Sequence, residues 1–549
     1  MNIKVSDFIV KYLERLGTEY VFGIPGAHIL PVYDALYDTK IKSILTKHEQ
    51  GAAFMAGGYA RQSGKIGVCI ATAGPGATNL VTGLANAYMD RLPVLAITGE
   101  TPTYSFGKGA LQESSGLGHS INQNYIFRGI TQYHTIVQRT DHILKIFRDI
   151  TGILLSRNPG PVLLSFPYNV LKETIDDSIM DNLRLSGASS QEGEDTLPSQ
   201  EILSMINKSH YPIIIAGYGS ILSKAEDLMS AFCTKTKIPI ATTLKARGIV
   251  PEASELSLGV LGITSNELAY RYISEKADLI IFSGASFGER TSYNWDHNLL
   301  NGKKIIQIDN DEKQLNKVFH ADIALKCDTR VFFENVTRML ADNASPKDSK
   351  DLAAYKAKYA NHDVKDNEFL LISYFLNKLN DHFNSEASIF DDNIIYMQRF
   401  CNISKSKSYF PNSGLSSLGH AVPAAIGAKL STEKPVIAIL GDGGFQMCCM
   451  EMMTAVNYKI PISVVLLNNS SLGLVRKNQF YNYNARFIAS EFVNPDYEKL
   501  SDAFNIDYYR VASTSDADSV FKSTDFRNKI NLIDLILDKD EFPKYSSGR

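Results

Sequence analysis

The sequence of 549 residues has no apolar run that approaches the roughly 18 residues needed to span a membrane. Its six cysteines show no CxxC spacing, so we expect buried thiols in a reducing compartment. The formal net charge of −3 gives no electrostatic reason to expect a nucleic acid or an anionic membrane as partner. The first residues form an amphipathic helix pattern without the long apolar core of a signal peptide. These absences predict a cytoplasmic globular protein.

What is present is an alternation of apolar, strand-like runs with helix-like segments along most of the chain. Hydrophobic residues make up 44% of the chain and charged residues 21%, an ordinary composition for a globular protein. Repeated strand–helix units predict the α/β class, with three doubly wound parallel-sheet domains. Two polar stretches without an apolar period predict linkers. The predicted division is residues 1–170, a linker at 171–198, residues 199–340, a linker at 341–367, and residues 368–549.

One stretch in the third region, from Val436 to Gly473, predicts a strand, a glycine turn, a helix and a second strand. The first strand ends in GDGG, with Asp442 at its tip, and the second ends in NN, with Asn469 at its tip. In a right-handed crossover both tips lie at the carboxyl edge of the sheet, where open α/β sheets bind ligands. Asp442, Asn469 and the Ser471 carbonyl would offer hard oxygens to Mg²⁺, and the glycine amides suit a diphosphate. GDG alone is a common tight turn, but its pairing with NN at this spacing favours a ligand site.

An acidic residue also follows an apolar strand near the N-terminus. Glu49 comes directly after the strand ILT, within KHEQGAAFMAGGYAR, and the turn TAGPGATN follows the next strand. Taken alone, Glu49 is an ordinary solvent-exposed acidic residue at a helix N-terminus, where the helix dipole favours an anion. A positioned, partly desolvated carboxyl group also suits general acid–base catalysis. The residues around Glu49 leave both interpretations open.

Together these motifs resemble the thiamine-diphosphate (ThDP) enzymes, and HEQGAAFMAGGYAR with TAGPGATN resembles their acetolactate-synthase-like branch. The resemblance covers almost the whole chain. It implies a pyrimidine-binding first domain, a central Rossmann-like domain and a diphosphate-binding third domain. It also implies that Glu49 hydrogen-bonds the aminopyrimidine ring and promotes ylide formation. Pro75 and Asn79 match positions that contact the pyrimidine half from the partner subunit.

Further positions follow from the same resemblance. Gln112, in GALQES, matches a polar glutamine near the reacting carbons. Leu418 stands where a bulky apolar residue props the cofactor in its bent conformation, although an ordinary core leucine explains this position equally well. The implied metal ligands are Asp442, Asn469 and Ser471. The resemblance implies that these three also bind the cofactor, together with Asn393, Gly414, Leu418, Gly441, Gly443, Gly444, Leu472, Gly473 and Leu474.

Two departures from the acetolactate synthases bear on specificity. Asn478 takes the place of a tryptophan found in synthases that choose 2-ketobutyrate, and an amide there favours an acceptor with hydroxyl or other polar groups. His28, in IPGAH, takes the place of a small residue. It is either a loop histidine in solvent or a pocket residue suited to proton relay. The predicted specificity residues also include Gly26, Leu111 and Leu474.

The middle region keeps part of the flavin site of the synthases. Thr242 to Leu244, Leu261-Gly262 and Arg290 match that site, whereas Asn158 and Ser286 replace two flavin-contacting arginines. Many members of the superfamily have an equivalent domain without a flavin. The sequence therefore leaves FAD open.

We therefore expect a ThDP- and Mg²⁺-dependent enzyme that decarboxylates a 2-keto acid, pyruvate being the first candidate, and ligates the activated aldehyde to a carbonyl acceptor. The predicted catalytic residues are Glu49, Gln112 and His28. Because Glu49 and Asp442 lie in different domains, and in different subunits in the resembling family, we expect a homodimer or homotetramer with active sites at the subunit interface. The alternatives are a ThDP-dependent C–C lyase or simple decarboxylase and, in another class, a catalytically silent regulatory or scaffold subunit.

Overall fold

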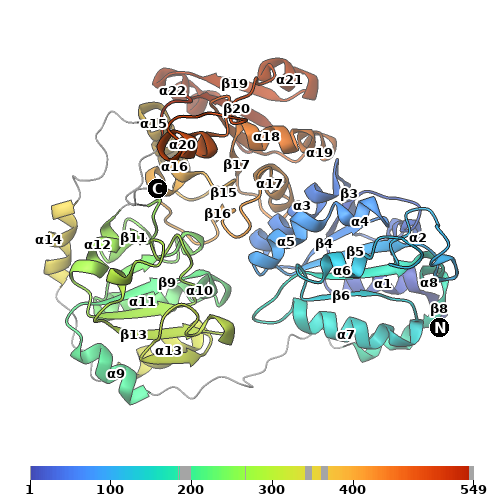
Figure 1. Cartoon of the computed structure of the whole chain (residues 1–549), viewed down its shortest axis with the longest axis horizontal. Coiled ribbons are helices and arrows are strands. Elements are labelled where there is room, and N and C mark those ends of the chain that lie inside the picture. The colour runs from blue at the N-terminus through green and yellow to red at the C-terminus, as the bar shows by residue number, and fades with distance from the viewer. Residues whose placement is uncertain are drawn as a thin grey trace.

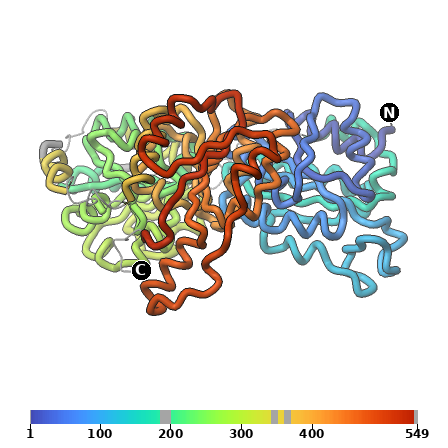
Figure 2. Tube along the Cα trace, turned by 90° about the horizontal axis from the view of Figure 1, so that it is seen from above, coloured from blue at the N-terminus to red at the C-terminus, as the bar shows by residue number. Residues whose placement is uncertain are grey.

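The computed structural model describes residues 2–183, 185, 199–265, 267–340, 349–359 and 369–542. Within them the chain forms three six-stranded parallel sheets, each with helices packed around it (Figure 1). The prediction of three doubly wound α/β domains is confirmed. Figure 2 shows the third domain, orange to red, between the middle domain in green and the first domain in blue.

The first domain has the strand order β3-β2-β4-β5-β7-β6. Its chain turns to one side of β2 to form β3 and then to the other side to form β4, so β2 and β4 flank the switch point where such sheets bind ligands. The strands are β2 (Tyr20–Gly23), β3 (Lys42–Leu45), β4 (Gly67–Ala71), β5 (Val94–Glu100), β6 (Tyr133–Ile136) and β7 (Val162–Pro167). The helices are α1 (Val5–Arg15), α2 (Leu30–Tyr37), α3 (Glu49–Ser63), α4 (Pro75–Thr78), α5 (Val81–Met89), α6 (Gln123–Phe127), α7 (Ile143–Leu154) and α8 (Tyr168–Lys172).

The third domain repeats the strand order of the first, as β16-β15-β17-β18-β20-β19, so its switch point lies between β15 and β17. The strands are β15 (Ser388–Asp391), β16 (Tyr409–Pro411), β17 (Val436–Gly441), β18 (Ser463–Asn468), β19 (Asp507–Val511) and β20 (Asn531–Ile536). The helices are α15 (Leu370–Phe383), α16 (Ile395–Phe400), α17 (Ala421–Lys429), α18 (Asp442–Cys448), α19 (Met452–Tyr458), α20 (Gly473–Asn482), α21 (Tyr497–Phe504) and α22 (Thr514–Ser523).

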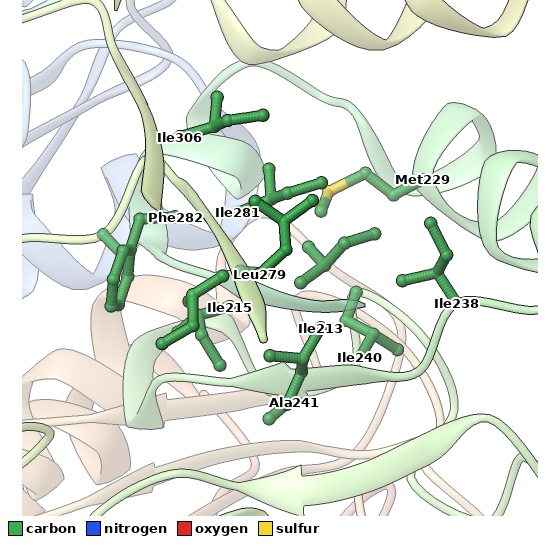
Figure 3. Packing of buried hydrophobic residues seen from close by; sticks show 14 of the residues in the cluster. Ile213, Ile215, Met229, Ile238, Ile240, Ala241, Leu279, Ile281, Phe282 and Ile306 are labelled. Atoms are coloured by element: carbon green, nitrogen blue, oxygen red, sulfur yellow. The ribbon is translucent and has the colours of Figure 1, made fainter. Parts of the chain in front are cut away.

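The middle domain has the order β11-β10-β9-β12-β13-β14, which is the Rossmann arrangement. Its central strands are apolar because both faces of the sheet are covered, as Figure 3 shows for Ile213 and Ile281 of the strands and Met229 of a covering helix. The strands are β9 (Pro212–Ala216), β10 (Ile240–Thr242), β11 (Ser257–Val260), β12 (Leu279–Ser283), β13 (Lys304–Asp309) and β14 (Ile323–Lys326). The helices are α9 (Ser199–Lys208), α10 (Tyr218–Leu222), α11 (Glu226–Thr236), α12 (Leu268–Glu275), α13 (Thr329–Met339) and α14 (Ser349–Tyr359).

Both predicted linkers contain regular structure. At the start of the first, β8 (Thr174–Asp176) pairs antiparallel with β1 (Asn2–Lys4), which ties it to the first domain. The second contains α14, whose Leu352 and Tyr355 are buried in the core of the middle domain. These segments are therefore not simple connections. Within the first predicted linker the structure also describes a 3-10 helix at Asp177–Asn182, whereas residues 184, 186–198, 341–348 and 360–367 of the two linkers lie outside the described residues.

Two helices rich in small residues, α3 and α17, join the first and third domains. A Cβ atom added at Gly58 of α3 would overlap the backbone carbonyl of Ala424, and one added at Gly427 of α17 would overlap that of Met55. Backbones this close leave no room for side chains, so a single hydrophobic core continues from one domain into the other. Among the described residues, no helix is both long and apolar enough to cross a membrane.

We expect Gly58→Ala to lower the midpoint of thermal unfolding, because the added methyl group must push α3 and α17 apart. Overpacking of this kind costs about 1–3 kcal/mol. The matched control is Gly152→Ala in α7, where an added Cβ meets no atom within 4 Å and alanine raises helix propensity by about 1 kcal/mol. Equal midpoints for the two variants would contradict the close packing of α3 on α17.

Candidate active site

The carboxylate of Glu49 lies at the carboxyl edge of the first sheet. Glu49 is the first residue of α3, directly beyond β3, and its side chain is buried. Asn79 Nδ2 donates a hydrogen bond of 2.9 Å to Glu49 Oε2. Gly76, in the turn after β4, lies so close that an added Cβ would be 3.4 Å from Glu49 Oε1. The structure thus brings the predicted Glu49 and Asn79 together, and the solvent-exposed interpretation of Glu49 is excluded within this chain.

A second buried glutamate, Glu451 of the third domain, holds the start of α3. The backbone N–H groups of Lys47 and His48 donate to Glu451 Oε1 at 3.1 and 3.0 Å. A side chain at Gly51 would overlap the same carboxylate, so the approach requires glycine. Burial raises the pKa of Glu451. Sequence reasoning missed this residue, because no local pattern marks a contact between residues some four hundred positions apart.

The predicted His28, Gln112 and Gly26 also come together, around Thr72. His28 Nδ1 lies 3.3 Å from Gln112 Oε1, and the Thr72 hydroxyl donates to the same oxygen at 3.4 Å. Gly26 packs directly on the Thr72 side chain. His28 is buried, with 8% of its surface exposed, which excludes a loop histidine in solvent.

A fully buried carboxylate, Glu100, fixes the loop that carries Gln112. Glu100 Oε1 accepts from the backbone N–H groups of Thr101 and Ser114 at 2.8 and 3.1 Å, and Oε2 accepts from the Ser114 hydroxyl at 2.6 Å. Ser114 in turn donates to Gln123 Oε1 at 3.0 Å. The last residue of β5 therefore orders the whole segment that follows it.

A cavity of about 230 Å³ opens at the switch point of the third sheet. All of its lining residues belong to the third domain. The predicted residues among them are Asn393, Leu418, Gly441, Gly443, Gly444, Asn469, Ser471, Leu472, Gly473 and Leu474. Residues of the segments 394–396 and 537–542 also line the cavity. They were not predicted, because neither segment contains a recognisable sequence motif.

Asp442 links the tips of the two strands that the glycine motif predicted. Its Oδ2 accepts from the backbone N–H groups of Asn469 and Ser470 at 3.1 and 2.6 Å and from Asn494 Nδ2 at 2.8 Å. Burial raises the pKa of Asp442. No lysine or arginine in the described ranges forms an ion pair with it. A buried carboxylate without a cationic partner beside an amide oxygen fits a site for Mg²⁺.

Another buried carboxylate, Asp392, lines the cavity. Its oxygens accept from the backbone N–H groups of Gly419 and Ala421, both at 2.7 Å, and so hold the loop of Leu418 at the start of α17. Burial raises the pKa of Asp392 to about 7. An added Cβ on Gly444 would lie 3.1 Å from Asp392 Oδ2, so glycine keeps this part of the cavity open.

Three family models match the chain along most of its length. They are the N-terminal TPP binding domain, the central domain and the C-terminal TPP binding domain of thiamine pyrophosphate enzymes, at residues 3–119, 199–336 and 393–534. The chain belongs to the thiamine pyrophosphate enzyme family. Thiamine pyrophosphate is the compound called ThDP above, and the protein is a ThDP-dependent enzyme.

Relatives of this ThDP enzyme match it from end to end. A probable acetolactate synthase large subunit of Methanocaldococcus jannaschii is 33% identical, over 98% of this chain and 93% of the relative. The acetolactate synthase large subunit of Lactococcus lactis is 32% identical with the same coverage. That of Corynebacterium glutamicum is 31% identical over 98% of this chain and 88% of its own length. The resemblance to the acetolactate-synthase-like branch is thereby confirmed.

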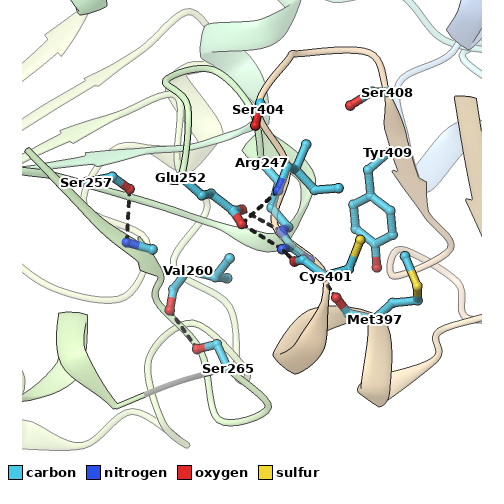
Figure 4. Close-up of polar contacts among 12 residues, drawn as sticks. Arg247, Glu252, Ser257, Val260, Ser265, Met397, Cys401, Ser404, Ser408 and Tyr409 are labelled. Atoms are coloured by element: carbon cyan, nitrogen blue, oxygen red, sulfur yellow. Dashed lines mark hydrogen bonds and ion pairs between the residues drawn. The ribbon is translucent and has the colours of Figure 1, made fainter. Parts of the chain in front are cut away.

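In this ThDP enzyme the middle domain supports the cavity wall through a buried arginine (Figure 4). Arg247 donates to both oxygens of Glu252, at 2.6 and 2.7 Å, and to the backbone carbonyl of Met397 at 2.9 Å. Its guanidinium also lies 5.1 Å from the centre of the Tyr409 ring. These contacts fix the chain just beyond the cavity-lining segment 392–396.

Asp442 and all the predicted residues of the first domain lie outside the cavity lining, as do Gly414 and Asn478 of the third domain. Gly414 packs against Met89 of α5, near the Lys245 ammonium group, and not against the cavity. Asn478 is exposed on α20, where its Oδ1 accepts from Asn482 at 2.6 Å. Leu111 is 71% exposed. Their roles toward a cofactor or substrate stay predictions.

The residues predicted to remain from a flavin site are neighbours in the middle domain. Leu261 N–H donates to the Thr242 carbonyl at 2.8 Å, and Ile263 N–H donates to that of Arg290 at 3.1 Å. The Arg290 side chain, however, donates to Asn393 beside the cavity. The amides of Gly217 and Gly219, after the first strand, pair with backbone carbonyls instead of facing outward. FAD stays an open prediction from the sequence, and no flavin enters the function proposed below.

Proposed function

We propose that the enzyme decarboxylates a 2-keto acid, pyruvate being the first candidate, and ligates the resulting two-carbon unit to a carbonyl acceptor more polar than those of the acetolactate synthases. The observation that carries this proposal is the pairing of two half-sites. Glu49 is buried and oriented by Asn79, and Asp442 is buried beside glycines at a cavity. A catalytically silent scaffold has no reason to keep both.

Each residue has a role set by its position. Asp442, Asn469 and the Ser471 carbonyl would hold Mg²⁺, and the amides near Gly443 and Gly444 would bind a diphosphate. Glu49 would hold and return a proton at a ring nitrogen of the cofactor. Bound ThDP supplies an electron sink for the electron pair released when CO₂ leaves. Leu418, which is 39% exposed on the cavity wall, would press against the cofactor.

The arrangement of the half-sites supports a homodimer. The lining of the cavity comes wholly from the third domain, whereas the side-chain hydrogen bond of Glu49 stays within the first domain. Large apolar side chains lie exposed near both half-sites, among them Leu111, Leu418 and Leu474. A second copy could cover these surfaces and bring the Glu49 of one protomer to the cavity of the other. A homotetramer would add a second such pair.

We expect the protein loaded with ThDP and Mg²⁺ to release CO₂ from pyruvate and to form a carboligated product when an aldehyde acceptor is present. Chelation with EDTA followed by dialysis should abolish CO₂ release, and added Mg²⁺ should restore it. Acetaldehyde as the sole product with every acceptor tested would favour the simple decarboxylase. Cleavage of a hydroxyketone without reaction of any 2-keto acid would favour the lyase. Absence of both activities in cofactor-loaded protein would favour the alternative of a catalytically silent subunit.

A further inference from the structure

The side chains of Thr72, Gln112 and His28 form one hydrogen-bonded row beside Glu49. Gln112 Oε1 is the shared member, 3.4 Å from the Thr72 hydroxyl and 3.3 Å from His28 Nδ1. Thr72 also packs against Gly76, which borders the Glu49 carboxylate. These residues follow β2, β3, β4 and β5, four adjacent strands of the sheet, so the row spans the edge where the reacting groups meet.

The chemistry of the row fixes which atoms donate. In the structure the carbonyl oxygen of the Gln112 amide faces the Thr72 hydroxyl, which donates to it. A carbonyl oxygen only accepts, and therefore His28 Nδ1 carries a proton in this contact. In its neutral form the imidazole then presents Nε2 as an acceptor, and the amide presents its NH₂ group as a donor. In the described part of the chain neither group has a hydrogen-bond partner, and neither is sealed from solvent.

The backbone around the row is built to hold it in place. Gln112 has a positive φ of 57°, a conformation that costs about 1 kcal/mol or more for a residue other than glycine. The Glu100 carboxylate supports that conformation through the N–H and hydroxyl groups of Ser114. On the other side, an added Cβ at Gly99 would lie 2.7 Å from the carbonyl carbon of His28. A donor and an acceptor are thus presented in fixed positions, as a site for one particular pair of substrate groups requires.

We propose that the acceptor substrate is a 2-hydroxy aldehyde or 2-hydroxy ketone, whose hydroxyl group donates to His28 Nε2 while an oxygen of the substrate accepts from the Gln112 amide. This inference rests on the carboligation proposed above. With pyruvate and glycolaldehyde, the bond between the keto carbon and the carboxyl group breaks and CO₂ leaves. The electron pair forms a bond to the aldehyde carbon, and the aldehyde oxygen takes a proton. The products are CO₂ and a dihydroxybutanone.

Thr72 is a positioning residue in this arrangement. It touches Gln112 and not the reacting atoms, and its hydroxyl decides which face of the amide points at the substrate. Without that hydroxyl the amide can turn over, which would place a carbonyl oxygen where the hydroxylated acceptor needs a donor. Loss of the Thr72 hydroxyl should therefore change which acceptor the enzyme prefers and should not affect proton transfer by Glu49.

The test is a competition between glycolaldehyde and propanal, which differ by a hydroxyl in place of a methyl group. Equal concentrations are incubated with pyruvate and the cofactor-loaded enzyme, and the two products are quantified from one reaction. We expect the hydroxylated product in about tenfold to hundredfold excess, because propanal leaves buried polar groups unpaired. Thr72→Val should bring the ratio of the glycolaldehyde product to the propanal product close to one, and Thr72→Ser should leave that ratio unchanged. The ratio is internal to each sample, so a partly unfolded variant does not change it.

A ratio near one in the unmodified enzyme, or an excess of the propanal product, would overturn the inference while the carboligase function stands. Failure to form either product, with or without CO₂ release, would instead overturn the proposed function. A Thr72→Val enzyme that keeps the full ratio would remove Thr72 from its positioning role.

Discussion

Glu49→Gln is expected to lower CO₂ release from pyruvate by about 100- to 10,000-fold, the usual contribution of a positioned acid–base group. Glutamine keeps the size of the side chain and can still accept from Asn79, but it cannot exchange a proton with a ring nitrogen. The fold should be unaffected, because the backbone around Glu49 is fixed by Glu451. The measurement is the initial rate with saturating ThDP and Mg²⁺, alongside the bound cofactor determined by mass spectrometry.

The matched control is Glu14→Gln, an identical change at an exposed position of α1. Its rate should equal that of the unmodified enzyme. If Glu49→Gln retained full activity while binding the cofactor normally, the assignment of Glu49 would fail and with it the proposed proton path. A variant that lost the cofactor altogether would show that Glu49 binds ThDP more than it activates it.

Asp442→Asn should abolish Mg²⁺-dependent retention of ThDP, with the apparent Kd of the cofactor rising by at least about 100-fold. Changes to residues that only orient metal ligands already cost 10- to 100-fold, and Asp442 is predicted to be a ligand itself. The apoprotein should lose only a little stability, since the asparagine oxygen can accept the three hydrogen bonds of Asp442 Oδ2 and only the bond from the Gly443 N–H to Oδ1 is lost. Calorimetric titration of ThDP at several Mg²⁺ concentrations would measure both effects.

For comparison, Asp502→Asn makes the same change at an exposed position of α21 and should bind ThDP normally. Unchanged Mg²⁺-dependent binding in Asp442→Asn would show that the metal lies elsewhere. The glycines around Asp442 would then be a turn and nothing more, as a lone GDG often is.

Most of the fold could be predicted because parallel strands buried on both faces leave continuous apolar runs. Apolar runs at residues 20–23, 67–71, 212–216, 279–283 and 304–309 coincide with β2, β4, β9, β12 and β13. The helix predicted after the glycine turn begins earlier, at Asp442, since the glycines continue directly into it, and it is interrupted at Cys449. The helix α14 was missed because a short polar segment buries only a few side chains, such as Leu352 and Tyr355.

The candidate site, like the fold, could be predicted only in part. Asp442 was found because its position at a strand tip and its chemistry coincide in the sequence, whereas Glu49 was assigned only through the family resemblance of the residues around it. Glu451 and Arg247 act through contacts with segments distant along the chain, which no local pattern indicates. The prediction that all six cysteines are buried holds for four, whereas Cys448 and Cys449 are partly exposed. Both lie just after the glycine turn and pack against the edge of the core that joins the first and third domains.

The shared core of α3 and α17 also determines when, during translation, the fold can be completed. Gly58 and Ala424 lie about 370 residues apart in the chain, yet their backbones touch. A ribosome that adds 5–20 residues per second needs roughly 20 to 70 s to make the second helix after the first. Throughout that time the nascent first domain exposes one side of α3, with its small apolar residues. The chain can therefore complete its core only near the end of translation, and it depends until then on protection from other exposed apolar surfaces.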